Sequence, residues 1–191
     1  MEDRLYQKGS TTGKKALTKS QVEQLLGAIT DLEDLALIKL AITSGMRRKD
    51  IVSLKKADID IKNRRISFYE HKKRRIHSVY LDQDTMNTLE MWIKKSKGSE
   101  WLFPAHFKKS KGHMSSRTAY NILNKNLKKA GLPERPFHAL RATCIKLYQK
   151  AGWTPEQVAE LTGDTIRTIQ QHYSTPSDEE MKKLVEEKPI L

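Results

Sequence analysis

The sequence predicts a mainly helical fold with one small antiparallel β-hairpin, an α+β arrangement. Apolar residues recur every three or four positions along most of the chain, which is the spacing of one face of a helix. One stretch in the first half alternates apolar and polar residues instead, and it is rich in β-forming residues. A chain of 191 residues can bury a core of its own. We therefore expect one domain, without internal repeats.

The predicted helices begin and end at recognisable local signals. In order, they are expected near residues 18–29, 32–43, 51–54, 84–95, 115–130, 137–151, 155–162 and 164–173. Thr18, with Gln21 three residues later, has the pattern of a capping box. Gly45 stops the second helix, since glycine commonly ends helices. Thr154-Pro155 has the pattern of a cap followed by proline at the first helical position.

The hairpin is expected from two alternating runs, residues 65–69 and 76–81. The turn that joins them, residues 70–75, is strongly basic. Residues 96–114 are expected to form a long basic loop, interrupted by the apolar run 101–103.

The charge of the chain points to a polyanionic partner. Lysine and arginine number 36 against 23 aspartate and glutamate, which gives a net charge of +13. An excess of this size favours nucleic acid as the partner, with an anionic membrane surface as the second candidate. The sequence has no lipidation motif and no strongly amphipathic basic helix that would support the membrane.

The sequence predicts a cytoplasmic protein, or a nuclear one in a nucleated cell. No apolar run approaches the roughly 18 residues that a membrane span needs, and the N-terminus lacks a signal-peptide core. Cys144 is the single cysteine, so no internal disulfide can form and a reducing compartment fits. Its neighbours Leu140, Ile145 and Leu147 indicate a core position for this thiol rather than a catalytic one.

Several classes of enzyme lack their motifs in this sequence. Neither a P-loop nor a Gly-x-Gly-x-x-Gly segment is present, which argues against the common nucleotide sites. Cys-x-x-Cys and His-Glu-x-x-His are absent, and the acidic residues show no close pairing suited to two metal ions. We therefore expect no cofactor and no metal site.

What remains is a set of cationic side chains around one tyrosine. His138 and Arg141 lie three residues apart at the start of a predicted helix, so both project from one face. Arg47 follows a helix-ending glycine, at a turn from which a side chain can reach a cleft. The predicted hairpin carries lysines at its tip, and a final helix leads from Asp164 to Tyr173.

In order and spacing, these segments resemble the catalytic domain of the tyrosine site-specific recombinases, the phage-integrase family. That family carries an arginine in a Thr-Gly-[Leu/Met]-Arg turn, a hairpin lysine, a His-x-x-Arg motif, and a tyrosine nine residues after a Leu-[Leu/Thr]-Gly-His turn. The corresponding residues here are Arg47, Lys72, His138, Arg141, Asp164 and Tyr173. The resemblance runs from about Leu17 to Thr175, which is nearly the whole chain.

The resemblance implies an integrase-type catalytic domain at residues 17–176, after a flexible basic leader at 1–16. It implies that residues 177–191 form a tail that can dock on a neighbouring subunit. An N-terminal domain normally completes the family's clamp around DNA, whereas only about 16 residues precede the catalytic domain here.

The implied function is site-specific recombination or integration. The enzyme would cleave and rejoin double-stranded DNA through a 3′-phosphotyrosyl intermediate, without metal or ATP. The implied assembly is a homotetramer on DNA and a monomer or weak oligomer without it. Two alternatives remain open: a type IB topoisomerase-like enzyme that relaxes DNA, and a non-cutting DNA-binding protein on the same scaffold.

The resemblance also implies a role for each site residue. Arg47 and Arg141 would hold the phosphate, since a guanidinium offers a planar fork of donors. Tyr173 would attack, and His138 would accept or relay its proton. The lysine that protonates the leaving 5′-oxygen would be Lys72, with Lys73 as the other candidate. Contacts with DNA are expected from Lys73, Arg74, Arg75, Lys108, Lys109 and Lys111.

The chain departs from the family pattern at Asp164, where the family has histidine or sometimes tryptophan. An ionised carboxylate cannot donate a hydrogen bond to phosphate. Asp164 would instead orient Arg47 or Arg141, or it would cap the helix that begins there. His172, beside the tyrosine, could then replace the missing donor. Both interpretations of Asp164 are open at this point.

Overall fold

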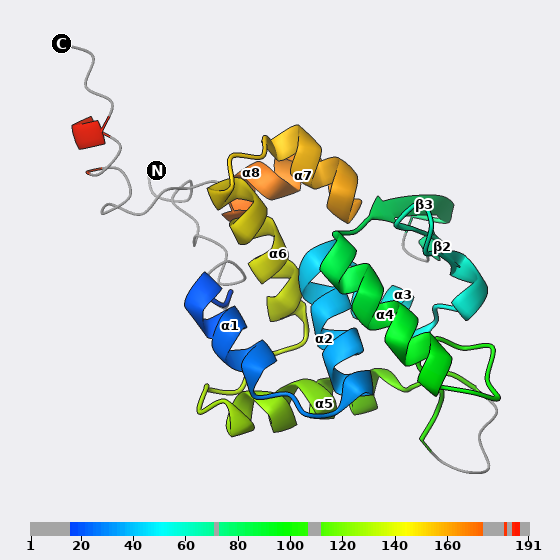
Figure 1. Cartoon of the computed structure of the whole chain (residues 1–191). Helices are drawn as coiled ribbons and strands as arrows, with labels where there is room; N and C mark the ends of the chain where they lie inside the picture. Colours follow the sequence, from blue (N-terminus) through cyan, green and yellow to red (C-terminus); the bar gives the residue numbers. More distant parts are fainter. Residues whose placement is uncertain (1–15, 71–72, 107–111, 174–181, 183–184, 188–191) are drawn as a thin grey trace, which may run out of the picture.

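The computed structural model describes residues 16–70, 73–106, 112–173, 182 and 185–187, without the side chains of residues 171–173. Helices make up most of this part of the chain, as predicted (Figure 1). Their bounds are α1 Lys19–Gly27, α2 Leu32–Ser44, α3 Arg48–Val52, α4 Gln83–Lys95, α5 Ser116–Lys129, α6 His138–Lys150, α7 Pro155–Thr162 and α8 Ile166–Tyr173. The short helix α3 begins three residues earlier than expected, and a 3-10 turn, Lys56–Asp58, follows it.

The predicted helix signals act as expected where the structure describes them. Thr18 caps α1 in a complete capping box with Gln21. Thr154 caps α7 in the same way, with Pro155 in the first turn. Gly45 ends α2 in the left-handed conformation, with φ of 61°. Each of these boundaries therefore has a local cause: a side-chain hydrogen bond at Thr18 and Thr154, and a left-handed glycine at Gly45.

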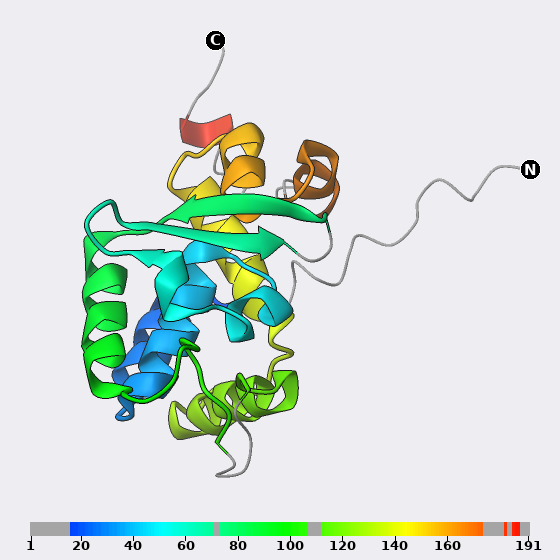
Figure 2. The same ribbon diagram turned by 90° about the vertical axis from the view of Figure 1, so that its right-hand side faces the viewer.

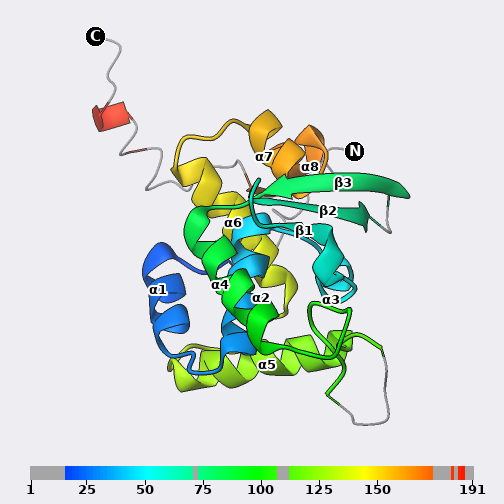
Figure 3. The same cartoon turned by 45° about the vertical axis from the view of Figure 1, so that its right-hand side comes forward.

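The predicted hairpin is confirmed, and it belongs to a sheet of three antiparallel strands in the order β1-β2-β3. The strands are β1 (Ile59–Asp60), β2 (Arg65–Glu70) and β3 (Arg75–Tyr80), and Glu70 pairs with Arg75 at the turn. Two residues are too few to show an alternating pattern, so β1 was not predicted. Figures 2 and 3 show the hairpin lying across the helices, with α3 against β2 and α7 beside β3.

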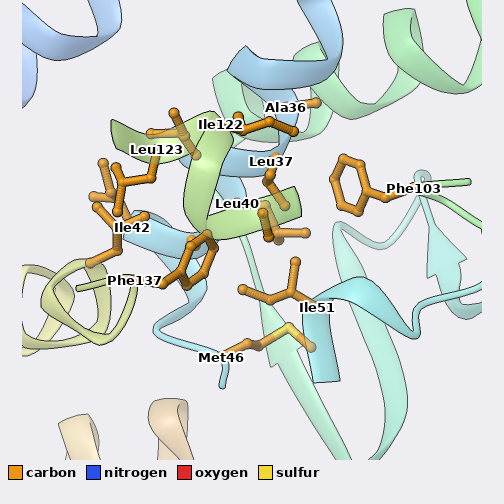
Figure 4. Close-up of a cluster of buried hydrophobic side chains, with 14 of the residues drawn as sticks. Ala36, Leu37, Leu40, Ile42, Met46, Ile51, Phe103, Ile122, Leu123 and Phe137 are labelled. Carbon is orange, nitrogen blue, oxygen red and sulfur yellow. The ribbon is translucent and has the colours of Figure 1, made fainter. Parts of the chain in front are cut away.

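The core is built around α2, which packs against α4, α5 and α6 (Figure 1). Most of its residues are buried, because α2 is surrounded on several sides. Figure 4 shows Leu37 and Leu40 of α2 among side chains from α5 and from the segment that precedes α6. This packing fixes the C-terminal end of α2, from which the Arg47 turn leaves.

A second, smaller cluster joins the last three helices. Ala142 and Ile145 of α6 pack with Val158 and Ala159 of α7 and with Ile169 of α8. Ile169 is fully buried, so it fixes α8 against the other two helices. This cluster determines where the backbone of Tyr173 lies.

The expected loop at residues 96–114 is only partly irregular in the described portion. Leu102 and Phe103 are fully buried, and isolated bridges pair Lys55 with Trp101 and Pro104 with His113. The Leu102 amide donates to the Leu54 carbonyl at 2.8 Å. The apolar run 101–103 thus attaches this segment to the core. The sequence did not indicate this attachment, because the residues around the run are mostly basic.

Cys144 is buried, as predicted. Burial raises the pKa of its thiol to about 12, well above the range in which a thiolate forms. Over the residues described, no helix combines the length and the apolar character that crossing a membrane requires.

We predict that Gly45→Ala destabilises the fold by roughly 2–5 kcal/mol. A left-handed non-glycine residue costs roughly 1–2 kcal/mol, and overpacking costs roughly 1–3 kcal/mol. Both apply here, because a Cβ at Gly45 would lie 2.9 Å from Cys144 Sγ and 2.9 Å from Thr162 Cγ2. Urea unfolding measures the change.

Gly98→Ala is the matched control for this substitution. Gly98 also has a positive φ, of 82°, but no atom lies within 4 Å of the place that an alanine methyl group would take there. Gly98→Ala should lower the free energy of unfolding only by the cost of the left-handed backbone, roughly 1–2 kcal/mol. Equal losses at the two glycines would contradict the packing role of Gly45.

Candidate active site

Arg47 is placed by the turn between α2 and α3. The left-handed conformation of Gly45 reverses the chain, Met46 is buried at 3% exposure, and Arg47 then stands just before α3. Its guanidinium contacts two carboxylates from other elements. Nη1 pairs with Oε1 of Glu70, at the end of β2, and Nη2 pairs with Oδ1 of Asp164 at 3.1 Å.

Arg141 and His138 share the first turn of α6, on one face, as predicted. The side chain of Arg141 is only 3% exposed. Its Nε donates to Oδ2 of Asp164 at 3.1 Å, and its Nη1 donates to the Gly45 carbonyl. Its Nη2 lies 2.7 Å from Oδ2 of Asp164, which makes an ion pair but lacks the geometry of a hydrogen bond. This buried nitrogen therefore has no hydrogen-bond acceptor among the described residues.

Asp164 bridges the two arginines. It follows Gly163 in the turn between α7 and α8, and it gives one oxygen to Arg47 and the other to Arg141. The capping interpretation is wrong, because the hydroxyl of Thr165 accepts from the Thr168 amide at the start of α8. Orientation of the arginines is therefore the role that its contacts favour.

Glu70 is a member of this cluster that was not predicted from the sequence. It is 1% exposed and accepts from Arg47 and, at 3.3 Å, from Nε of Arg75. Burial works to raise the pKa of Glu70, but the hydrogen bonds from Arg47 and Arg75 outweigh it and lower the pKa overall. The signal was present, because strand alternation places Glu70 on the same face as Ile66 and Phe68.

His138 lies beside the arginines and is suited to be neutral at pH 7. Its burial lowers its pKa, and the positive charges of Arg141 and Arg47 lower it further, against an opposing effect of Asp164. A neutral imidazole has a free nitrogen lone pair that can accept a proton. The site thus holds a candidate base next to two guanidinium groups.

A cleft of ≈ 780 Å³ opens beside these groups. It lies between the α2–α3 turn and the first turns of α5 and α6. Its lining residues are Met46, Arg47, Arg48, Lys49, Asp50, Ser116, Arg117, Tyr120, Pro136, Phe137, His138 and Arg141. Arg48, Lys49 and Arg117 were not selected from the sequence, because charge alone does not show which way a side chain faces.

The remaining predicted residues are placed only in part. Tyr173 is the last residue of α8, and its side chain lies outside the described part of the structure. Lys73, Arg74 and Arg75 are exposed on the hairpin. Outside the described residues lie Lys72, Lys108, Lys109 and Lys111, together with most of the leader and of the tail. The roles assigned to these residues stay predictions.

Metal ligands do not cluster in the described part of the chain. No three side chains of histidine, cysteine, aspartate or glutamate gather there in a way that could hold an ion. At the candidate site, the ion pairs join Arg47 and Arg141 to the carboxylates of Asp164 and Glu70.

Comparison with known proteins identifies relatives along nearly all of the chain. The sequence profile of the phage integrase family matches residues 15–180. Tyrosine recombinase XerA of Saccharolobus solfataricus is 29% identical over 157 residues, which cover 82% of this chain and 50% of the relative. XerA of Thermococcus kodakarensis is 25% identical over 180 residues, covering 93% of this chain and 64% of the relative. The chain therefore spans one half to two thirds of these relatives.

Solved structures share the fold. A crystal structure of XerA recombinase has a TM-score of 0.79 at 18% identity, over 92% of this chain and 66% of that chain. The Tn1549 transposon integrase, in complex with a circular intermediate DNA, has a TM-score of 0.75 at 19% identity, over 98% of this chain and 68% of that chain. With the family profile covering most of its residues, this chain belongs to the phage integrase family and has the fold of tyrosine recombinases.

Proposed function

We propose that this chain cleaves and rejoins DNA strands through a 3′-phosphotyrosyl intermediate, as a site-specific recombinase or integrase. The observation that carries the proposal is the convergence of Arg47 and Arg141 on one small anion, the carboxylate of Asp164. Two guanidinium groups from separate elements that close around one carboxylate are also close enough together to bind one phosphate. Membership of the family supports the same reaction.

The arginines meet the electrostatic need of the reaction. A phosphodiester is negatively charged, and its transition state places more charge on the non-bridging oxygens. Guanidinium groups stay protonated and offer planar pairs of donors to those oxygens. Nη2 of Arg141 is buried against Asp164 and lacks a hydrogen-bond acceptor among the described residues. We propose that it donates to a phosphate oxygen once the phosphate displaces the carboxylate.

In the proposed chemical step, the attacking tyrosine loses a proton and the leaving 5′-oxygen gains one. The Tyr173 oxygen attacks phosphorus while its proton passes to His138, whose lowered pKa keeps it neutral and able to accept. The bond between phosphorus and the 5′-oxygen breaks, and Lys72 or Lys73 protonates that oxygen. The 3′-phosphotyrosyl ester retains the energy of the broken bond, so attack by a 5′-hydroxyl reverses the step without ATP.

The proposed partner is double-stranded DNA, which the cleft would contact through its backbone. Arg48, Lys49 and Arg117 supply positive charge beside the arginine pair. The Tn1549 integrase structure is a complex with DNA, which supports this partner. Recombination joins two duplexes at four active sites, so we propose a tetramer on DNA, with residues 177–191 docking between subunits.

One observation favours a second candidate, a DNA-binding protein that does not cut. Asp164 and Glu70 already neutralise the positive charges of Arg47 and Arg141. A phosphate must share or displace these contacts before it binds both arginines. If it cannot, the basic cleft would still bind DNA and no cleavage would follow.

A suicide substrate separates the two candidates. A duplex nicked near the scissile phosphate loses its short 5′-hydroxyl product, so the covalent complex accumulates. We expect the native chain to form this complex on a cognate site and Tyr173→Phe to form none. The complex is measured by denaturing gel electrophoresis, and its absence with both proteins would favour the non-cutting candidate. Relaxation of a supercoiled plasmid without joint products would instead indicate a topoisomerase-like enzyme.

We predict that Arg47→Ala and Arg141→Ala each slow cleavage by on the order of 100- to 1,000-fold, the usual effect of removing one donor to a transition-state oxygen. DNA affinity should change little, because the other cations supply most of the salt-dependent binding. Single-turnover cleavage and a binding titration measure the two quantities. Arg117→Ala is the control: it should weaken binding and leave cleavage of bound DNA near normal. Normal cleavage by either of the first two variants would refute their assignment.

We predict that the pKa of His138 in the folded protein lies below its ordinary value of 6.5. Because the folded pKa is depressed, the unfolded chain binds more protons within this window. The contribution of His138 to stability is full above the ordinary pKa and is lost as the pH falls toward the folded pKa. NMR titration of the imidazole gives the pKa, and His138→Gln should remove this part of the pH dependence of unfolding. An imidazole that titrates above 6.5 would contradict the proposed base.

A further inference from the structure

Glu70 is a buried acid at the junction of the hairpin and the arginine pair. Its exposure is 1%, and a carboxylate at such a depth is costly to ionise unless cations pair with it. Its two oxygens have separate partners: Oε1 accepts from Arg47, and Oε2 accepts from Arg75 at 3.3 Å. It thus connects Arg47 with the turn end of the hairpin.

Arg47 is consequently held at two points. Glu70 engages Nη1 and Asp164 engages Nη2, so the plane of the guanidinium is fixed from two directions. Arg141 is held differently, by Asp164 and by the Gly45 carbonyl, with no contact to Glu70 among the hydrogen bonds described. Asp164 therefore acts on both arginines, whereas Glu70 acts on Arg47.

The surroundings of Glu70 keep its carboxylate in place. A Cβ at Gly163 would lie 3.3 Å from each of its oxygens, so the turn that carries Asp164 packs directly over it. The Glu70 carbonyl also accepts from the amides of Lys73 and Arg74, which closes the hairpin turn. The hairpin, the α7–α8 turn and Arg47 therefore all contact Glu70.

We propose that Glu70 is a positioning residue of the cleavage site, which holds the Arg47 guanidinium in the orientation that binds the scissile phosphate. This inference rests on the proposed function. Glu70 itself would not touch DNA, since both of its oxygens are occupied by arginines and a carboxylate repels a phosphate. Its effect on cleavage would pass through Arg47.

The test compares two substrates that differ in charge at the scissile position. In a methylphosphonate, a methyl group replaces one non-bridging oxygen, which removes the negative charge that Arg47 would neutralise. Glu70→Gln should slow cleavage of the ordinary phosphodiester by on the order of tenfold to a hundredfold, as expected for a misplaced binding group. Relative to the native chain, the defect should largely disappear on the methylphosphonate, as it should for Arg47→Ala.

Two further variants complete the test. Glu100→Gln is the matched control, because Glu100 is exposed and pairs only at the surface, with Lys55 at 2.9 Å; it should cleave both substrates like the native chain. Glu70→Asp keeps the charge but draws the carboxylate back. It should show a weaker form of the same substrate pattern, and it carries the test if Glu70→Gln does not fold.

The outcomes are distinct. Selective loss on the charged substrate supports the proposal. Normal cleavage by the Glu70 variants, or an equal loss on both substrates, overturns it while leaving the proposed function intact. A native chain that forms no covalent complex with either substrate overturns the proposed function, and the role of Glu70 with it.

Discussion

The carboxylate of Asp164 holds two arginines that come from distant parts of the chain, and the rest of the site is arranged around it. Removing an arginine such as Arg141 from water costs several kcal/mol in order of magnitude unless a counter-charge is near. The chain supplies that counter-charge only when the α2–α3 turn, the start of α6 and the α7–α8 turn meet. The contacts that complete the fold are therefore those that assemble the candidate active site.

Local patterns predicted the helices because their causes are local. Thr18 and Thr154 form capping boxes within their own first turns, and the spacing of apolar residues needs no partner to be recognised. The hairpin was predicted in the same way, from the alternation of apolar and polar residues along its two strands. Leu102 and Phe103 were harder to interpret, because their burial depends on contacts with distant segments.

The site was predicted unevenly for a physical reason. His138, Arg141 and Arg47 could be selected because they lie in short motifs whose spacing matches a known family. Glu70 lies in no such motif. Because four basic residues follow it closely, it was assigned to the hairpin turn and not to the buried face of β2. The two interpretations of Asp164 differed only in the partner of one side chain, which requires three-dimensional contacts to decide.

Gly45 limits which residues of the cleft can be varied in a redesign. One residue ends α2, aims Arg47, gives its carbonyl to Arg141, and packs against Cys144 and Thr162. The candidate active site therefore tolerates little variation at that position. Arg48, Lys49 and Arg117 line the cleft and are not among the residues that contact Gly45. A library for redesign can vary those three side chains while the turn at Gly45 is kept constant.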